Sequence, residues 1–343
     1  MNSNSFFVSL KKDLTHNCFL FEGDEEYLKQ SALDALKEKL THPPFGEMNF
    51  TVLSDPDDKQ IIQLSETLPF MAEKRLIVVK ESRFVKEGAG KSKTPKQQDA
   101  LSKYLDNLPA SSVIVFYCKG KSTGNKKIVK KIKKDGGQVL FDTLSEAALT
   151  KWIARELKKY GKKIDGNTAQ YLMFICGRDM TVLSNEIAKA AMVDAKSNVL
   201  TAQDIDAICT KTREYRVFDL SEQVASGDSA KAVRLMNSLI EDGEPRLLLL
   251  SLLQRQYRQM LFAKILKESN APNANTAKTL GVPAFVVGKL LKAAENYSVE
   301  TLKKAYEMLI FAEYEVKSGK TPEVGSLENA VFRLLCLKEK AAV

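Results

Sequence analysis

IIQLSETLPFMAEKRLIVV, residues 61–79, is the stretch that decides how the first part of the chain folds. It begins with apolar side chains at helical spacing, and it ends in an unbroken apolar run at residues 76–79. A run of this kind, bounded by polar residues, is typical of a strand buried on both faces of a parallel sheet. Because a proline disfavours the α conformation of the preceding residue, Pro69 is expected to end the helix at Leu68.

The connection between this helix and this strand is apolar, although connections run over the protein surface and are normally polar. It reads Leu68-Pro69-Phe70-Met71 and is expected at a helix-to-strand tip on the edge of the sheet. In one interpretation Phe70 and Met71 fold back into the core. In the other they form an exposed anchor for a pocket on a partner protein, the kind of aromatic contact that dominates an interface. The stretch alone leaves both interpretations open.

The composition is that of a globular protein with more than one domain. A chain of 343 residues is expected to form two or three domains, and a hydrophobic fraction of 44% with a charged fraction of 28% allows sizeable cores. No apolar run approaches the length of a membrane span, and the N-terminus lacks the basic and apolar regions of a signal peptide. We therefore expect a cytoplasmic protein that does not enter a membrane.

Side chains suited to catalysis are sparse. The five cysteines are scattered without a CxxC pair, which indicates a reducing compartment and argues against disulfides and against a zinc site. Only two histidines are present, so the usual acid–base and metal chemistry has few candidates. We therefore expect no catalytic residue, no metal and no cofactor. The net charge of +9 is compatible with a polyanion such as DNA nearby, but it does not require one.

Strands alternate with helices through the first part of the chain. The expected strands are residues 18–21, 48–53, 76–79, 113–117 and 139–141. The expected helices between them are residues 28–40, 59–68, 97–108 and 126–134. This alternation predicts βαβ units and a mostly parallel sheet, with residues 1–142 forming one α/β domain.

The first strand-to-helix turn does not have the composition of a nucleotide site. A P-loop needs a lysine for the phosphates and a hydroxyl for magnesium. The turn here, Glu22-Gly23-Asp24-Glu25-Glu26, has one glycine, no lysine and several carboxylates, whose charge would repel ATP. Gly88-Ala89-Gly90-Lys91-Ser92 resembles the end of a P-loop, but Val85 stands where the first glycine is required and Pro95 interrupts the following helix. The sequence therefore predicts no nucleotide site.

From Thr143 onward the pattern is helical only. Thr143-Leu144-Ser145-Glu146 reads as a capping box, and Asp179 and Thr201 are expected to cap later helices. Residues 143–211 are predicted to form a small helical domain. Residues 212–343 are predicted to form a larger one, with helices near residues 218–225, 229–240, 245–267, 275–280, 284–296, 299–318 and 324–340.

Two segments resemble nucleic-acid signals. Lysines crowd the helix at residues 126–134, and the candidates to face DNA are Lys126, Lys127, Lys130, Lys131 and Lys134. The other interpretation is a solvated basic face, and no aromatic residue is interleaved to stack on bases. Residues 277–292 mimic a helix-turn-helix, but their second helix offers apolar side chains rather than the polar ones that read base edges. A stand-alone DNA-binding regulator built on residues 277–292 is the alternative function.

The whole chain resembles the delta subunit of the bacterial DNA polymerase III clamp loader. The order and spacing of several segments carry this resemblance. They are FLFEGDE at 19–25, LPFMAEKRLIVV at 68–79, GRD at 177–179, LSNEIAK at 183–189, VFDLSEQVASGD at 217–228, LLQRQYRQM at 252–260 and AKTLGVPAFVVGKLLK at 277–292. The motor subunits and delta-prime of the same complex are marked by a P-loop or by zinc cysteines, which this sequence lacks.

The resemblance implies an AAA+-like domain that has lost its ATP site, a helical lid domain, and a helical collar domain that assembles with other subunits. It implies a non-catalytic subunit of a DNA-directed DNA polymerase holoenzyme, a nucleotidyltransferase. The implied partners are the sliding clamp (beta), the ATPase gamma/tau and delta-prime subunits, and primer–template DNA within the complex.

The resemblance also assigns a role to the apolar connection. In this family two hydrophobic residues of the first domain enter a pocket of the ring-shaped clamp and hold the ring open. Carried over, this element is Leu68-Pro69-Phe70-Met71, in which Phe70 is the clearest match and either Leu68 or Met71 is the second hydrophobe. Some members have a Leu-Phe pair where this chain has Pro69-Phe70.

Overall fold

The computed structural model describes residues 1–341 except 13, 15, 42, 87–94, 125 and 193–197. The chain divides into two compact units, Met1–Leu149 and Thr150–Val343. The division into three domains that the sequence predicts is finer than these two units, and it stays a prediction. Within the described residues, no helix combines the length and the apolar character that a bilayer crossing requires.

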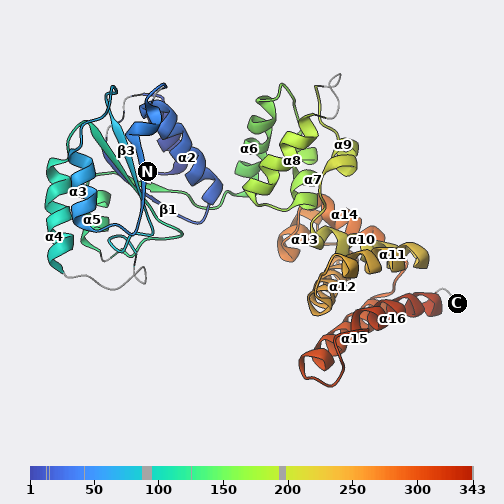
Figure 1. Ribbon diagram of the computed structural model, residues 1–343. Helices are drawn as coiled ribbons and strands as arrows, with labels where there is room; N and C mark the ends of the chain where they lie inside the picture. Colours follow the sequence, from blue (N-terminus) through green and yellow to red (C-terminus); the bar gives the residue numbers. More distant parts are fainter. Residues whose placement is uncertain are drawn as a thin grey trace. The chain divides into compact units, whose positions relative to one another are not determined.

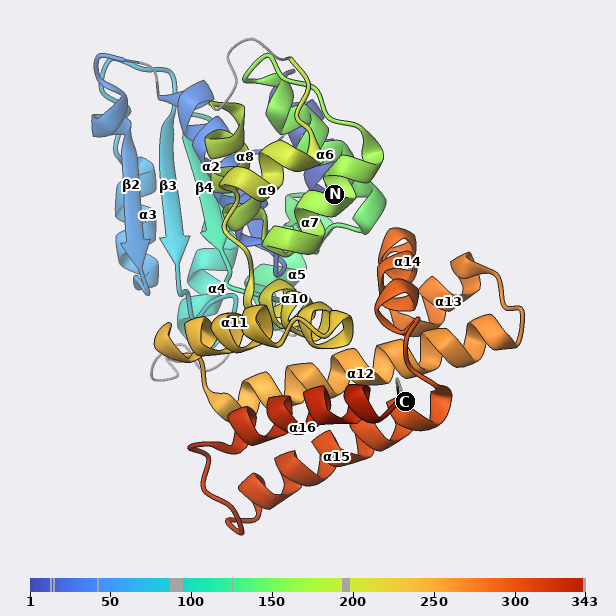
Figure 2. The same ribbon diagram turned by 90° about the vertical axis from the view of Figure 1, so that its right-hand side faces the viewer.

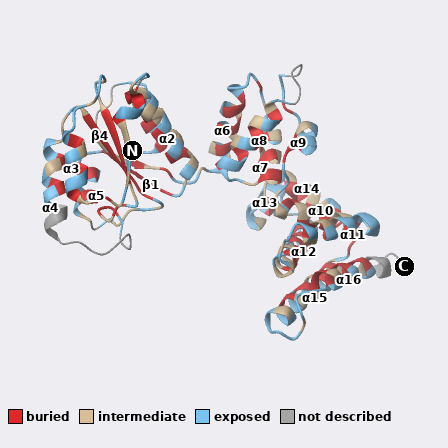
Figure 3. Cartoon of the chain, viewed as in Figure 1, coloured by how far each residue is buried: buried red, intermediate tan, exposed pale blue. Residues whose placement is uncertain are grey.

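The first unit is built on a parallel sheet of five strands in the order β2-β3-β4-β1-β5 (Figure 1). The strands are β1 Cys18–Glu22, β2 Phe50–Ser54, β3 Arg75–Lys80, β4 Ser112–Tyr117 and β5 Gln138–Leu140. Side chains of the inner strands β3 and β4 are buried almost throughout, as the apolar run at 76–79 predicts (Figure 3). The expected parallel α/β architecture is therefore confirmed.

Helices cover both faces of this sheet (Figure 1). They are α1 Ser3–Leu10, α2 Glu26–Leu40, α3 Asp58–Glu66, α4 Pro95–Tyr104 and α5 Lys127–Lys134, with short 3-10 helices η1 Gly46–Asn49 and η2 Leu105–Asn107. Side chains of α3, α4 and α5 share one apolar core with those of β1, β3 and β4. On the other face, Phe6 of α1 packs edge-on against Phe19 and Phe21 of β1, with ring centroids 5.6 and 5.1 Å apart.

Three expectations about this part of the chain need correction. The strand expected at 48–53 begins at Phe50, because the preceding residues form η1. The helix expected to end at Leu68 ends at Glu66, because Thr67 already has an extended backbone. The cap expected at Thr143 lies at Ser145, whose hydroxyl accepts from the Ala148 N–H at 3.3 Å, and α6 begins only at Glu146.

The second unit is helical throughout its described residues. Its helices are α6 Glu146–Lys158, α7 Gly166–Cys176, α8 Met180–Ala191, α9 Ala202–Ile208, α10 Arg213–Ser226, α11 Ser229–Glu241, α12 Arg246–Glu268, α13 Asn273–Leu280, α14 Ala284–Ala293, α15 Val299–Lys317 and α16 Ser326–Ala341. Asp179 and Thr201 cap α8 and α9 as expected. The long helix α12 runs beside α15 and α16 (Figure 2), and Leu249, Leu253 and Tyr257 of α12 are fully buried among its neighbours.

The paired valines Val78 and Val52 compare a buried position on the inner strand β3 with an exposed one on the edge strand β2. They face each other across the β3–β2 ladder, but Val78 is fully buried whereas Val52 is 46% exposed. Val78→Ala is expected to lower the free energy of unfolding of the first unit by about 2 kcal/mol or more, because it removes buried apolar surface and leaves a cavity. Val52→Ala, the matched control, should cost less than about 1 kcal/mol. Urea titration followed by circular dichroism measures both, and equal losses would contradict this account.

Candidate functional site

The apolar connection between α3 and β3 lies at one edge of the sheet. It precedes β3, and because all five strands are parallel, it lies at the edge formed by their amino ends. We call Leu68, Pro69, Phe70 and Met71 the apolar tip. The side chains of Leu68 and Met71 are 78% and 76% exposed, and Phe70 is 49% exposed. The interpretation that Phe70 and Met71 fold back into the core is therefore wrong.

The backbone of the apolar tip is held in place although its side chains are exposed. The side-chain amide of Asn49, which is fully buried at the end of η1, binds both backbone polar groups of Phe70. Asn49 Nδ2 donates to the Phe70 carbonyl at 2.9 Å, and the Phe70 N–H donates to Asn49 Oδ1 at 2.7 Å. Met71 has a left-handed backbone with φ of 47°, which is uncommon for a residue other than glycine. The tip is thus a fixed turn.

Two further apolar side chains come from the segment before Asn49. The ring of Phe45 meets that of Phe70 edge-to-face, with centroids 5.2 Å apart and planes at 87°. Met48 is 61% exposed. Edge-to-face pairs of this kind hold aromatic rings in a defined relative position. Phe45 therefore gives the Phe70 ring apolar support, and it lies before the strand expected at 48–53, where the sequence predicted no element.

In the turn after β1, where a nucleotide would bind in a P-loop protein, two backbone donors are engaged by carbonyls from elsewhere in the protein. The N–H of Gly23 donates to the Gly120 carbonyl at 2.8 Å, and the N–H of Glu25 donates to the Phe141 carbonyl at 2.9 Å. A β-carbon on Gly23 would lie 2.3 Å from the carbonyl oxygen of Phe141. These N–H groups are therefore unavailable to a phosphate.

An ion pair between a buried lysine and a half-exposed glutamate lies beside this turn. Lys29 of α2 is fully buried, and its ammonium donates to the Glu26 carboxylate at 2.5 Å and to the Cys118 carbonyl at 2.9 Å. Burial raises the pKa of Glu22, but hydrogen bonds from Ser122 and Gln138 outweigh it, and the net pKa lies below the usual range. The carboxylates of Glu22 and Glu26 thus have partners inside the protein. The segment 88–92 that resembles the end of a P-loop lies outside the described residues.

The five candidate DNA-facing lysines divide into two groups. Lys127 pairs with Asp99 at 2.5 Å, and Lys131 pairs with Asp106 and, at 3.5 Å, with Asp135. Among the described residues, no ion pair involves the other three, Lys126, Lys130 and Lys134. Only part of the predicted patch therefore carries uncompensated positive charge.

The segment 277–292 packs as a structural element. It covers parts of α13 and α14, and Val286, Val287 and Leu290 of α14 are buried in the core of the second unit. Phe285 meets Phe174 of α7 edge-to-face, with ring centroids 5.6 Å apart. The side chains that a recognition helix would need at a base edge are thus apolar and packed inside. This geometry does not favour the alternative function of a stand-alone DNA-binding regulator.

One cluster of metal-ligating side chains was missed from the sequence. The ligand atoms of Cys176, Glu186 and Cys209 lie within 4.8 Å of one another, and all three residues are buried. A hydrogen bond with Cys209 and burial together raise the pKa of the Cys176 thiol. The Glu186 carboxylate already accepts from the Thr210 N–H at 3.0 Å and pairs with Lys189 at 2.7 Å. Because that carboxylate is engaged, we interpret the cluster as a polar contact between α7, α8 and the end of α9.

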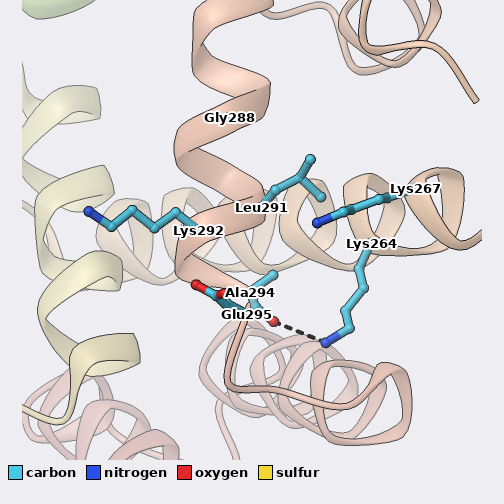
Figure 4. Close-up of a pocket in the computed structure, with 7 residues that line it drawn as sticks. All are labelled: Lys264, Lys267, Gly288, Leu291, Lys292, Ala294 and Glu295. Carbon is cyan, nitrogen blue, oxygen red and sulfur yellow. Dashed lines mark hydrogen bonds between the residues drawn. The ribbon is translucent and has the colours of Figure 1, made fainter.

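A basic hollow of about 380 Å³ lies between α12 and α14 in the second unit (Figure 4). It is lined by Lys264, Lys267, Gly288, Leu291, Lys292, Ala294 and Glu295. The Lys264 ammonium donates to the carbonyl of Ala294 at 3.1 Å and to that of Tyr297. It thus satisfies carbonyl groups at and just beyond the C-terminal end of α14. This lysine therefore serves the fold, and the hollow is a weaker site candidate than the apolar tip.

Known proteins resemble the chain along nearly its whole length. It is 25% identical to the DNA polymerase III subunit delta of Bacillus subtilis over 336 residues, which are 97% of this chain and 96% of that protein. It is 21% identical to the same subunit of Escherichia coli over 331 residues, 95% of this chain and 93% of that protein. The solved structure of the Bacillus subtilis DNA clamp loader delta protein has a similar fold, with a TM-score of 0.57, 24% identity and coverage of 97% and 99%.

Two family descriptions match the two ends of the chain. The description "DNA polymerase III, delta subunit" matches residues 19–141, and "DNA polymerase III delta subunit, C-terminal domain" matches residues 214–334. The first range contains the sheet and the apolar tip, and the second contains the long helix α12 and the helices packed around it. The expected fold class, an AAA+-like parallel-sheet region followed by helical regions, agrees with these matches. The chain therefore belongs to the family of the delta subunit of DNA polymerase III.

Proposed function

We propose that this chain is the subunit of a clamp loader that binds the sliding clamp and holds it open for loading onto primed DNA. The observation that carries the proposal is the apolar tip, which exposes Leu68, Phe70 and Met71 on a backbone that Asn49 holds fixed. Exposed apolar side chains of this size mark interaction sites, and burial of one aromatic ring in a pocket contributes roughly 1.5–3 kcal/mol.

Clamp opening follows from a difference in affinity. A protein shifts the equilibrium between a closed and an opened ring only if it binds the opened ring more tightly. The tip has the rigidity for this task, because a fixed turn fits one geometry of its pocket and loses affinity for another. Phe70 is the first anchor, and Leu68 and Met71, which are almost equally exposed, both remain candidates for the second.

The chain acts without nucleotide and without a reaction of its own. This part of the proposal is supported by the turn after β1, whose N–H groups at Gly23 and Glu25 are engaged by carbonyls of the protein. The carboxylates of the same turn would repel phosphates. ATP hydrolysis is then the task of neighbouring ATPase subunits, gamma/tau, and the chain is a non-catalytic subunit of the polymerase holoenzyme.

The C-terminal helices are the collar through which the chain assembles with the ATPase and delta-prime subunits. This role is supported by aromatic side chains that the fold leaves exposed on α15 and α16. Phe311 is 65% exposed, Tyr314 56% and Phe332 50%. Aromatic residues are enriched at protein interfaces. The assembled complex works on primer–template DNA in the cytoplasm, and Lys126, Lys130 and Lys134 are the side chains that would approach the phosphates.

Phe70→Ala is expected to weaken binding of the purified chain to its cognate sliding clamp by about 2 kcal/mol or more, roughly thirtyfold, because the ring that fills the clamp pocket is lost. Isothermal titration calorimetry measures the affinity, and circular dichroism checks that the fold is intact.

Phe332→Ala is the matched control for this change, since Phe332 on α16 has nearly the same exposure, 50% against 49%. It should leave the clamp affinity of the isolated chain unchanged and weaken assembly with the ATPase subunits. If Phe70→Ala does not change the clamp affinity, the clamp contact does not involve Phe70 and lies elsewhere on the chain.

Reversing the charge of Lys126, Lys130 and Lys134 to glutamate is expected to weaken binding of the assembled loader to primer–template DNA. The slope of affinity against salt concentration should also decrease, because fewer counterions are released. Gel-shift titration at several salt concentrations measures both. The control carries the same reversal at three exposed lysines outside this helix, Lys12, Lys158 and Lys303. Unchanged DNA binding by the first variant would remove this helix from the DNA contact.

The isolated chain is expected to bind no Mg-ATP, because the Gly23 and Glu25 N–H groups of its turn after β1 are engaged by carbonyls of the protein and the turn carries no lysine for the phosphates. The melting temperature should therefore not rise when millimolar Mg-ATP is added. A concentration-dependent rise would contradict this part of the proposal, since a ligand that binds only the folded state must stabilise it.

A further inference from the structure

Phe70 has no regular secondary structure to fix its backbone. Helix α3 ends at Glu66 and strand β3 begins at Arg75, so Phe70 lies between the two elements. Its N–H and carbonyl are instead both bound by the side chain of one residue, Asn49, at 2.7 and 2.9 Å. An asparagine amide placed in this way replaces the pair of hydrogen bonds that a neighbouring strand would make.

The three hydrogen bonds of the Asn49 amide join it to two residues, Phe45 and Phe70. Its second N–H donates to the Phe45 carbonyl at 3.2 Å, and Phe45 carries the ring that meets Phe70 edge-to-face. Rotating the amide by half a turn would bring its oxygen against both carbonyls, so only one orientation satisfies the three contacts. Asn49 thus connects the Phe45–Asn49 segment to the apolar tip, and it is fully buried while it does so.

We propose that Asn49 is a positioning residue for clamp binding. It does not itself contact the clamp, because it is buried, and it acts through the backbone of Phe70. Because this backbone is already held, the turn does not have to become ordered when the Phe70 ring enters its pocket. Binding therefore does not lose the conformational entropy that ordering a flexible turn would cost. The inference rests on the proposed function, since it concerns the same tip and the same partner.

An isosteric substitution separates the hydrogen bonds of the Asn49 amide from the space that its side chain fills. Asn49→Asp keeps the size of the side chain and the acceptor for the Phe70 N–H. It places a charged oxygen, which has no proton to donate, next to the carbonyls of Phe45 and Phe70. The aspartate is therefore expected to release the tip much as alanine does, although it fills the same space.

The test is a clamp-binding titration with the full-length chain. Asn49→Ala and Asn49→Asp are each expected to weaken clamp binding about tenfold, while Gln30→Ala on the exposed face of α2 leaves it unchanged. Combining Asn49→Ala with Phe70→Ala should weaken binding no further than Phe70→Ala alone, because the two changes remove the same contact. Hydrogen exchange at the Phe70 amide should accelerate in Asn49→Ala, which removes the acceptor of this N–H, and less or not at all in Asn49→Asp, which keeps an acceptor there.

Each outcome decides between the inference and the proposed function. If the unaltered chain does not bind the clamp, the proposed function fails. If it binds and Phe70→Ala weakens binding but the Asn49 variants do not, the proposed function stands and the positioning role is overturned. Losses that add in the double variant would also overturn it, because Asn49 would then act independently of Phe70. If Asn49→Ala unfolds, the same comparisons are made with the isosteric Asn49→Asp.

Discussion

The pairing of β3 between β2 and β4 is the constraint on which the functional part of this protein depends. Val78 of β3 pairs with Val52 on one side and with Val115 on the other, and the strand is buried on both faces. This burial sets where β3 begins, and α3 packs into the same core just before it. The apolar tip connects the end of α3 to the start of β3, and the positions of these two elements place it at the amino edge of the sheet.

The two edges of this sheet have different chemistry. At the carboxyl edge, the Gly23 and Glu25 N–H groups of the turn after β1 bind carbonyls of the protein, and the buried Lys29 lies next to Glu26. At the amino edge, the protein exposes apolar side chains on a fixed backbone. Parallel α/β sheets usually bind ligands beyond the carboxyl ends of their strands. We therefore propose that the protein partner binds at the amino edge and that no nucleotide binds at the carboxyl edge.

Much of the fold could be predicted from local sequence patterns, and the parts that could not depend on distant contacts. The buried strands, the apolar connection and the caps at Asp179 and Thr201 are visible within a few residues of sequence. The role of Asn49 is not, because its partner Phe70 lies 21 positions away and no local pattern connects them. Cys176 and Cys209 are likewise brought together only by the packing of α7 and α9. The apolar tip could be located from sequence, but its support could not.

The central claim is that the chain binds an opened clamp more tightly than a closed one. The most direct test compares its affinity for a sliding clamp whose subunit interfaces are covalently cross-linked shut with its affinity for the same clamp after the cross-links are released. The account predicts markedly tighter binding to the released clamp, by about tenfold or more, because only that ring can adopt the favoured state. Equal affinity for the two clamps would contradict it, since a protein with no preference between the states cannot hold the ring open.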